Sequence, residues 1–206
     1  MVGVSKSFRR IPVLQDVNLS VRQGDCLAIT GPNGSGKSVL FKLMCRFVVP
    51  DTGHISIDPA YLSPKGTFPV GFGVIIDRPG YIASRTGMDN LRELAAIRRV
   101  IGDDEIADAM ERVGLDPETS QPVGKYSLGM KQKLALAQAF MEHQPVLLLD
   151  EPFNGLDESS VALVRELLQG FLDEGRTIVF TSHNPEDVAI LSTRRCVIDN
   201  YHLVEK

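Results

Sequence analysis

The residues best suited to chemistry lie in one short stretch, Gly31-Pro32-Asn33-Gly34-Ser35-Gly36-Lys37-Ser38, which fits the pattern G-x-x-x-x-G-K-[ST]. Glycines let a backbone curl so that successive N–H groups point inward and hold phosphate oxygens. In such a loop the lysine, here Lys37, reaches the β- and γ-phosphates of a nucleotide, and the Ser38 hydroxyl binds Mg²⁺. A helix that starts here would direct its positive end at the same anion. The stretch therefore predicts a nucleotide-binding loop.

The sequence on either side supports this interpretation over a glycine-rich turn that matches by chance. Residues 26–29 form a short apolar run, which is typical of a buried strand. Beyond the loop, apolar residues recur at helical spacing up to about residue 49, at Val39, Leu40, Leu43, Met44 and Phe47. Strand, loop and helix are the order that the pattern requires.

Two adjacent carboxylates form the second candidate site. Asp150 and Glu151 directly follow the apolar run at residues 146–149. In phosphate-loop ATPases the first such carboxylate holds Mg²⁺ and its waters. The second is then placed to polarise an attacking water. The alternative is a pair that simply faces solvent at the end of a strand, but the upstream loop favours the catalytic interpretation.

Three more segments complete a pattern along the chain. Ser127-Leu128-Gly129-Met130-Lys131-Gln132 precedes a predicted helix, Asn154-Gly155-Leu156-Asp157 follows the carboxylates, and Thr181-Ser182-His183-Asn184 ends the next predicted strand. Together with the two sites above, their order and spacing resemble those of the ATP-binding cassette (ABC) ATPases over nearly the whole chain. Single motifs of this kind are weak evidence, whereas five in the right order are specific.

The resemblance implies a role for each matching residue. It implies that ATP is bound by an aromatic ring stacked on adenine, by the phosphate loop, and by the signature segment of another subunit: Phe8; Gly31, Pro32, Asn33, Gly34, Ser35, Gly36, Lys37, Ser38 and Val39; Ser127 and Gly129. It implies Mg²⁺ ligation by Ser38, Asp77 and Asp150, and catalysis by Glu151 as general base together with Lys37 and His183, which contacts the γ-phosphate. Asp157 would lie between subunits.

Two departures from the family pattern indicate a particular subfamily. The signature, commonly Leu-Ser-Gly-Gly-Gln, reads Tyr126-Ser127-Leu128-Gly129-Met130, and Asp77 stands where the family usually has a glutamine. An acid there adds negative charge beside the phosphates, so ATP binding would depend more on Mg²⁺; the alternative is a turn residue before the break at 78–80. Both segments look like those of the bacitracin-resistance and lantibiotic-immunity subfamily, whose members energise export of peptide antibiotics or drugs.

The rest of the sequence predicts an α/β domain of the P-loop NTPase type. We expect a strand or hairpin at 11–24, a short strand at Ile55 and Ile57, and another strand over 70–76. Residues 86–143 predict helices, including one capped by Thr86 with an apolar stripe that contains Leu91 and Ile97, one at 103–113 and one at 128–143. The last third predicts strands at 146–149, 177–181 and 196–198, and helices at 159–174 and 185–191.

The expected architecture is a single ABC-type ATPase domain over residues 1–206. Residues 1–84 and 144–206 would form a RecA-like core with a mostly parallel sheet and an N-terminal antiparallel β part. Residues 85–143 would form an inserted helical subdomain that carries the signature segment.

The composition of the chain indicates where the protein is located and which partners it is not expected to bind. The net charge of −4 without a dense Lys/Arg run argues against nucleic acid as a partner. No apolar stretch approaches the roughly 18–20 residues that cross a bilayer, and the first ten residues lack the apolar core of a signal peptide. The three cysteines, Cys26, Cys45 and Cys196, are widely spaced and suit buried thiols in a reducing cytoplasm rather than a metal site.

The resemblance implies the ATP-binding and hydrolysing subunit of an ABC transporter. Such a subunit would be cytoplasmic, peripheral on the inner face of the membrane, and would drive export through a separate transmembrane permease subunit. It would pair with a second ABC ATPase subunit, most simply an identical copy. A soluble ABC-type ATPase of a non-transport assembly machine is the alternative, and a P-loop kinase is disfavoured by the signature segment and His183.

Overall fold

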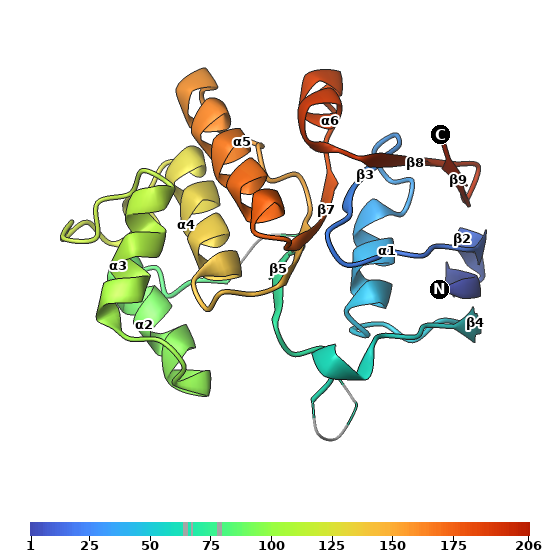
Figure 1. The fold of residues 1–206 in the computed structure, drawn as a ribbon, viewed down its shortest axis with the longest axis horizontal. Coiled ribbons are helices and arrows are strands. Elements are labelled where there is room, and N and C mark those ends of the chain that lie inside the picture. Colours follow the sequence, from blue (N-terminus) through green and yellow to red (C-terminus); the bar gives the residue numbers. More distant parts are fainter. Residues whose placement is uncertain (64–65, 67, 78–79) are drawn as a thin grey trace.

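A computed structural model describes residues 1–63, 66, 68–77 and 80–206 (Figure 1). The predicted break at Arg78 and Pro79 lies outside the described residues. The strands are β1 (Val2–Phe8), β2 (Ile11–Val17), β3 (Cys26–Thr30), β4 (Thr52–His54), β5 (Phe72–Ile75), β6 (Val146–Leu149), β7 (Thr177–Thr181), β8 (Arg194–Asp199) and β9 (His202–Glu205). The helices are α1 (Lys37–Met44), α2 (Gly87–Arg98), α3 (Asp103–Arg112), α4 (Leu128–Phe140), α5 (Glu158–Asp173) and α6 (Pro185–Leu191), with short 3₁₀ turns at Pro59–Tyr61 and Val123–Lys125.

The central sheet has six strands in the order β5-β6-β7-β3-β8-β9, all parallel except β9. Strands β6 and β7 are buried along their whole length, as continuous apolar runs in a parallel sheet should be. Because β3, β6 and β7 are parallel neighbours, their carboxyl ends lie at one edge. Residues 31–36, Asp150 and Glu151, and Ser182 and His183 directly follow these three strands. The sheet therefore brings three distant segments of the sequence together.

A smaller antiparallel sheet, in the order β2-β1-β4, lies beside α1 (Figure 1). Val4, Leu14 and Val17 are fully buried and pack in one cluster with residues of β3 and α1. Of the strand or hairpin predicted at 11–24, a strand forms over Ile11–Val17, and residues 18–24 form no second strand. The partner of this strand is β1, which the apolar alternation did not reveal.

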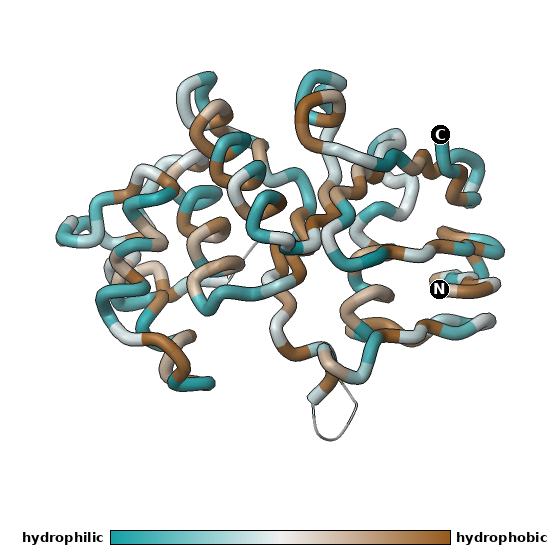
Figure 2. The backbone as a smooth tube through the Cα atoms, viewed as in Figure 1, coloured by the Kyte–Doolittle hydropathy of each residue, from teal (hydrophilic) through white to brown (hydrophobic). Residues whose placement is uncertain are grey.

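The helices α2, α3 and α4 gather on the opposite side of the molecule from this antiparallel sheet (Figure 1). Leu91, Ile106 and Leu134 from these helices belong to the same buried cluster as Phe140 and Phe171. Figure 2 shows the hydrophobic segments concentrated in the central strands and the hydrophilic ones toward the periphery. All three cysteines are buried, and burial raises the pKa of Cys26 and Cys45 to about 12, so these thiols are protonated at neutral pH.

Some local predictions are wrong. The short strand predicted at Ile55 and Ile57 forms instead at β4, because pairing with β1 places Val2 opposite His54 and residues 55–57 extend past that pair. Phe47 lies outside α1, which ends at Met44 just before Arg46 takes a left-handed backbone with φ 58°. Ile97 is 77 % exposed, so it is no part of the buried stripe of α2. Among the described residues, no helix is both long and apolar enough to cross a membrane.

Candidate functional site

The predicted phosphate loop leads from β3 into α1 and needs its glycines. Gly31 has φ 150° and Gly36 has φ 104°, both in the region that side chains disfavour. A Cβ on Gly31 would lie 2.8 Å from Ser35 Oγ and 2.9 Å from the carbonyl oxygen of Ile198. Ser35 Oγ is itself buried without a hydrogen-bond partner among the described residues. A tight loop that carries an unpartnered hydroxyl fits a phosphate ligand.

Lys37 is nearly buried, and its ammonium closes the loop on itself. Nζ donates to the carbonyl oxygens of Gly31 at 2.8 Å and Pro32 at 3.2 Å. The same Nζ lies 3.5 Å from Nε2 of His183, which comes from the segment after β7. The structure thus brings Lys37 and His183, predicted separately, to one place. An ammonium held at the centre of such a loop can also donate to phosphate oxygens.

The first carboxylate, Asp150, lies against the first turn of α1. One of its oxygens accepts the Ser38 hydroxyl at 2.5 Å, and the other accepts the Thr181 hydroxyl at 2.8 Å. A hydroxyl and a carboxylate this close fit a Mg²⁺ ion that keeps several waters and binds phosphate as well. Among the described residues, no group of three or more His, Cys, Asp and Glu side chains forms a metal cluster.

Thr181 is a residue that the sequence analysis did not assign to the site. It is fully buried at the end of β7, and its hydroxyl both donates to Asp150 and accepts the backbone N–H of Glu151 at 2.8 Å. Leu149 pairs with Phe180, so the next residues along β6 and β7 face each other. The signal that could have found Thr181 is a hydroxyl at the carboxyl end of a neighbouring parallel strand.

Glu151 combines a perturbed carboxyl with a strained backbone. Its φ is 53°, a left-handed value that costs energy for a residue with a side chain. Burial raises the pKa of its carboxyl above the usual range, and nearby Asp150 adds to this, while His183 and Lys37 oppose it. Oε1 lies 2.9 Å from His183 Nε2, yet no well-directed hydrogen bond reaches it from the described residues. A carboxylate with a raised pKa and an uncommitted oxygen can act as a general base.

Asp77 follows the end of β5 at the same sheet edge. It is more than half exposed, has φ 57°, and its Oδ2 pairs with Lys42 Nζ at 2.6 Å. Lys42 lies one helical turn beyond Ser38 on α1. Among the described residues, no hydrogen bond joins Asp77 to Ser38 or Asp150. The structure therefore places Asp77 near the site but commits its charge to a lysine.

Phe8 ends β1 and keeps about half of its ring exposed. Lys6 Nζ lies 5.4 Å from the ring centroid, so one side of the ring carries a cation contact. The exposed remainder is available for stacking on a flat base.

The signature segment lies at the start of α4. Ser127 caps this helix by accepting the N–H of Met130 at 3.1 Å, and Leu128 is largely exposed. Gly129 packs against the loop after the carboxylates, since a Cβ there would lie 2.8 Å from the carbonyl oxygen of Gly155. No hydrogen bond or ion pair in the described part of the chain joins residues 127–129 to the phosphate loop. The structure thus separates the signature segment from the other predicted ATP-binding residues.

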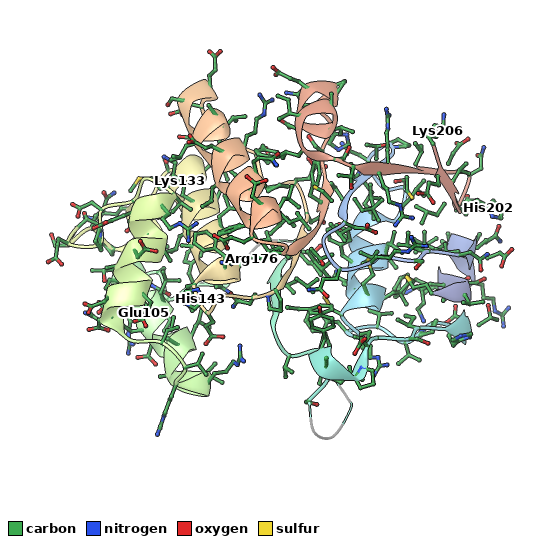
Figure 3. The ribbon with its side chains drawn as sticks, viewed as in Figure 1. Glu105, Lys133, His143, Arg176, His202 and Lys206 are labelled. Carbon is green, nitrogen blue, oxygen red and sulfur yellow. The ribbon has the colours of Figure 1, made fainter. Side chains whose placement is uncertain are left out.

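Two further polar residues shape the loop after β6. Gln132, on α4, donates to the backbone oxygens of Glu151 at 3.2 Å and Pro152 at 3.0 Å. Asp157 caps α5 by accepting the N–H of Ser160, and hydrogen bonds from Ser160 and Ser159 lower its pKa to about 2. The other three histidines are exposed, and Figure 3 shows His143 beyond the end of α4 and His202 on β9.

Comparisons with known proteins agree with this geometry. The family model described as ABC transporter matches residues 14–154. The chain is 33 % identical to the bacitracin transport ATP-binding protein BcrA of Enterococcus faecalis, over 99 % of this chain and 67 % of that protein. It is 32 % identical to the lantibiotic transport ATP-binding protein SrtF of Streptococcus pyogenes, over 92 % of this chain and 82 % of that one.

An uncharacterized ABC transporter ATP-binding protein of Bacillus subtilis, YybJ, is 36 % identical over 93 % of this chain and 88 % of its own length. Among solved structures, the dimeric ABC transporter cassette MJ0796 superposes with a TM-score of 0.88 at 22 % identity, covering 100 % of this chain and 96 % of that one. This likeness confirms the predicted fold: a mostly parallel sheet, an antiparallel β part and helices.

Proposed function

The chain belongs to the ABC transporter family of ATP-binding proteins, and from this premise we propose that it powers export of a peptide antibiotic, drug or similar compound through a separate membrane subunit. The observation that carries the ATPase part is the convergence of Lys37, Ser38, Asp150, Glu151 and His183 at one sheet edge. Relatives that transport bacitracin and lantibiotics support the substrate class.

The proposed mechanism assigns each converging group one task. Lys37 and the loop N–H groups bind the β- and γ-phosphates, and Phe8 stacks on adenine. Ser38 and Asp150 would hold Mg²⁺, which neutralises phosphate charge when bound. Glu151 orients the attacking water and accepts its proton, while Lys37 and His183 stabilise the charge that develops on the transferred phosphoryl group. Asp77 would reach the ion or its waters only after leaving Lys42.

A second copy of the chain would complete the site. Ser127 and Gly129 stand at an exposed helix start away from the phosphate loop, where N–H groups could meet ATP held by another subunit. A head-to-tail pair with two-fold symmetry would use both sites equally. In this proposal residues 85–143 act as a helical subdomain beside the RecA-like core of residues 1–84 and 144–206. Hydrolysis removes the phosphate that bridges the two copies.

We place the membrane subunit on a groove of about 320 Å³ between α2, α4 and residues 80–82. Tyr81 and Ile82 are exposed there, which suits an apolar contact. The ammonium of Lys131, which follows the signature residues, lies 5.4 Å from the Tyr81 ring centroid. A segment of the membrane subunit seated here would touch elements that lead both to Asp77 and to the signature. The chain itself would then be cytoplasmic and peripheral on the inner membrane face.

The test is affinity capture of the tagged chain from gently solubilised native membranes, followed by mass spectrometry. We expect recovery of a multi-span membrane protein with the native chain and with Ile190→Glu, a control at an exposed apolar residue on α6. Ile82→Glu should lose that protein while keeping ATP affinity. Recovery of soluble partners alone, with ATPase activity intact, would favour a non-transport assembly ATPase instead.

The substrate class has a separate test in the native cells. Deletion of the gene should increase sensitivity to bacitracin-type or lantibiotic peptides, and the native chain should restore resistance while Glu151→Gln should not. Unchanged sensitivity across such peptides would contradict the substrate class and leave the ATPase assignment standing.

A further inference from the structure

A buried ion pair holds the short segment that carries His183. Asp187, in the first turn of α6, is 2 % exposed, and its Oδ1 accepts hydrogen bonds from Arg165 Nε and Nη2 at 2.9 and 2.6 Å. Its Oδ2 accepts the Ser182 hydroxyl at 2.7 Å. Both carboxylate oxygens are therefore satisfied, as a charge withdrawn from water requires.

Ser182 connects this carboxylate to the backbone on the far side of His183. The Ser182 hydroxyl donates to Asp187 and accepts the N–H of Asn184 at 3.0 Å. His183 lies between the two bonded residues, so these hydrogen bonds hold its backbone in place. The imidazole itself is about half exposed. Its geometry toward Glu151 and Lys37 thus depends on the fixed backbone of residues 182–184.

Arg165 ties the same network to another part of the site. Arg165 lies about two turns into α5, the helix that Asp157 caps at the end of the loop after β6. Its guanidinium also reaches Glu186 at 2.9 Å, so it grips two successive residues of α6. A shift of α5 would therefore pull on Asp187 and, through Ser182, on the segment that presents His183.

We propose that Asp187 is a positioning residue for His183 and that Arg165 makes the place of the imidazole depend on α5. The inference rests on the proposed function, because it takes His183 as a group that contacts the γ-phosphate. A buried ion pair fixes orientation, and removing one partner leaves the other charge buried and lowers the free energy of unfolding. The test therefore compares the same substitution with and without the His183 imidazole, so that a loss of stability common to both backgrounds cancels.

A double-mutant cycle by single-turnover ATP hydrolysis on the full chain tests this proposal. Asp187→Asn keeps the shape of the side chain and should slow the reaction about tenfold, within the cost of a misplaced reacting group, with ATP affinity unchanged. In a His183→Ala background the same substitution should slow the remaining reaction by less than about twofold, because the group that it positions is gone. Arg165→Met should slow the native chain similarly and add nothing to Asp187→Asn.

The matched control is Asp103→Asn, which removes the exposed pair between Asp103 and Arg92 on α3 and α2. It should leave the rate unchanged. A second readout needs no turnover: the imidazole ¹H–¹³C resonances of the four histidines in the ATP-bound chain. Asp187→Asn and Arg165→Met should shift the His183 resonance and leave those of His54, His143 and His202 in place.

Three results would overturn the positioning role. The first is a native rate in the Asp187→Asn chain. The second is an equal loss of rate from Asp187→Asn in the native and His183→Ala backgrounds, and the third is a His183 resonance that does not move. The outcome for His183→Ala separates this inference from the proposed function. If His183→Ala is slow but Asp187→Asn is not, only the positioning role is wrong; if His183→Ala keeps the native rate, both fail.

Discussion

The phosphate-loop edge and the signature segment differ in how fully one chain satisfies their polar groups. At the loop edge, the Lys37 ammonium donates to a carbonyl oxygen of the phosphate loop, and Asp150 accepts the hydroxyls of Ser38 and Thr181. At the signature, Ser127 merely caps its own helix, and the exposed Leu128 stands beside it. The first region is preorganised for ATP within one chain, whereas the second presents a surface that needs a partner. The difference implies that ATP affinity belongs to one chain and turnover to two.

The largest expected effect comes from Glu151→Gln, which removes the proposed general base and keeps the shape of the side chain. Turnover should fall by roughly 10²–10⁴-fold, the usual worth of general base catalysis, while ATP affinity stays within about twofold. Steady-state hydrolysis and equilibrium ATP binding measure the two quantities, with the exposed Glu118→Gln as control. Undiminished turnover would contradict the assignment of the base.

Ser127→Asp tests the other side of the comparison, because aspartate can keep the cap of α4 while adding a negative charge. A carboxylate at the signature would repel the phosphates of ATP held by the partner, so turnover should fall by roughly 10²–10³-fold, the cost of losing a transition-state donor. ATP binding by the isolated chain should not change. The control is Gly102→Asp, which adds the same charge at the N-cap of α3, a position where aspartate is favoured. A parallel loss of ATP affinity would show that the two regions are not separate.

Thr181→Val should slow turnover about tenfold, because it leaves an oxygen of Asp150 and the N–H of Glu151 without their partner. The same unpaired groups should lower the free energy of unfolding by about 1–3 kcal/mol. Thr181→Ser restores the hydroxyl and should recover most of both quantities. Hydrolysis rates and denaturant unfolding provide the measurements, and equal losses in the serine and valine variants would argue against the hydroxyl.

Thr181 shows which parts of the site could be predicted from the sequence and which could not. The loop glycines, the paired carboxylates and His183 each follow an apolar run, so their meeting at one sheet edge could be predicted from strand order in a parallel sheet. The partner of Thr181 depends on register between strands about 30 residues apart, and the partner of Asp77, Lys42, depends on how α1 packs. A local sequence pattern predicts neither of these two contacts.

The same limit explains the errors in secondary structure. The strands β1 and β9 form by pairing with β2 and β8, although their own apolar patterns are weak. Ile55 and Ile57 show the opposite case, in which a good alternation lies beyond the paired residues of β1. Long apolar runs and helical stripes were reliable because burial alone enforces them.

The smallest expected effect concerns Asp157, whose pKa is lowered to about 2 from its usual value near 3.8. A lowered pKa means that the charged form stabilises the fold above the unfolded value and that this contribution is lost as pH falls from about 4 to about 2. Asp157→Asn keeps a cap without the charge. Its small loss in thermal midpoint relative to the native chain should therefore shrink over that pH range, whereas a constant difference would contradict the charged cap.

The most direct test of a site shared between two chains is the mass of Glu151→Gln in solution, by light scattering, without nucleotide and with MgATP. The account predicts a single chain without nucleotide and a two-chain species with MgATP, and predicts that adding Ser127→Asp abolishes the pair while ATP still binds. A chain that stays single with bound ATP, together with a native hydrolysis rate per chain that does not depend on protein concentration, would contradict it.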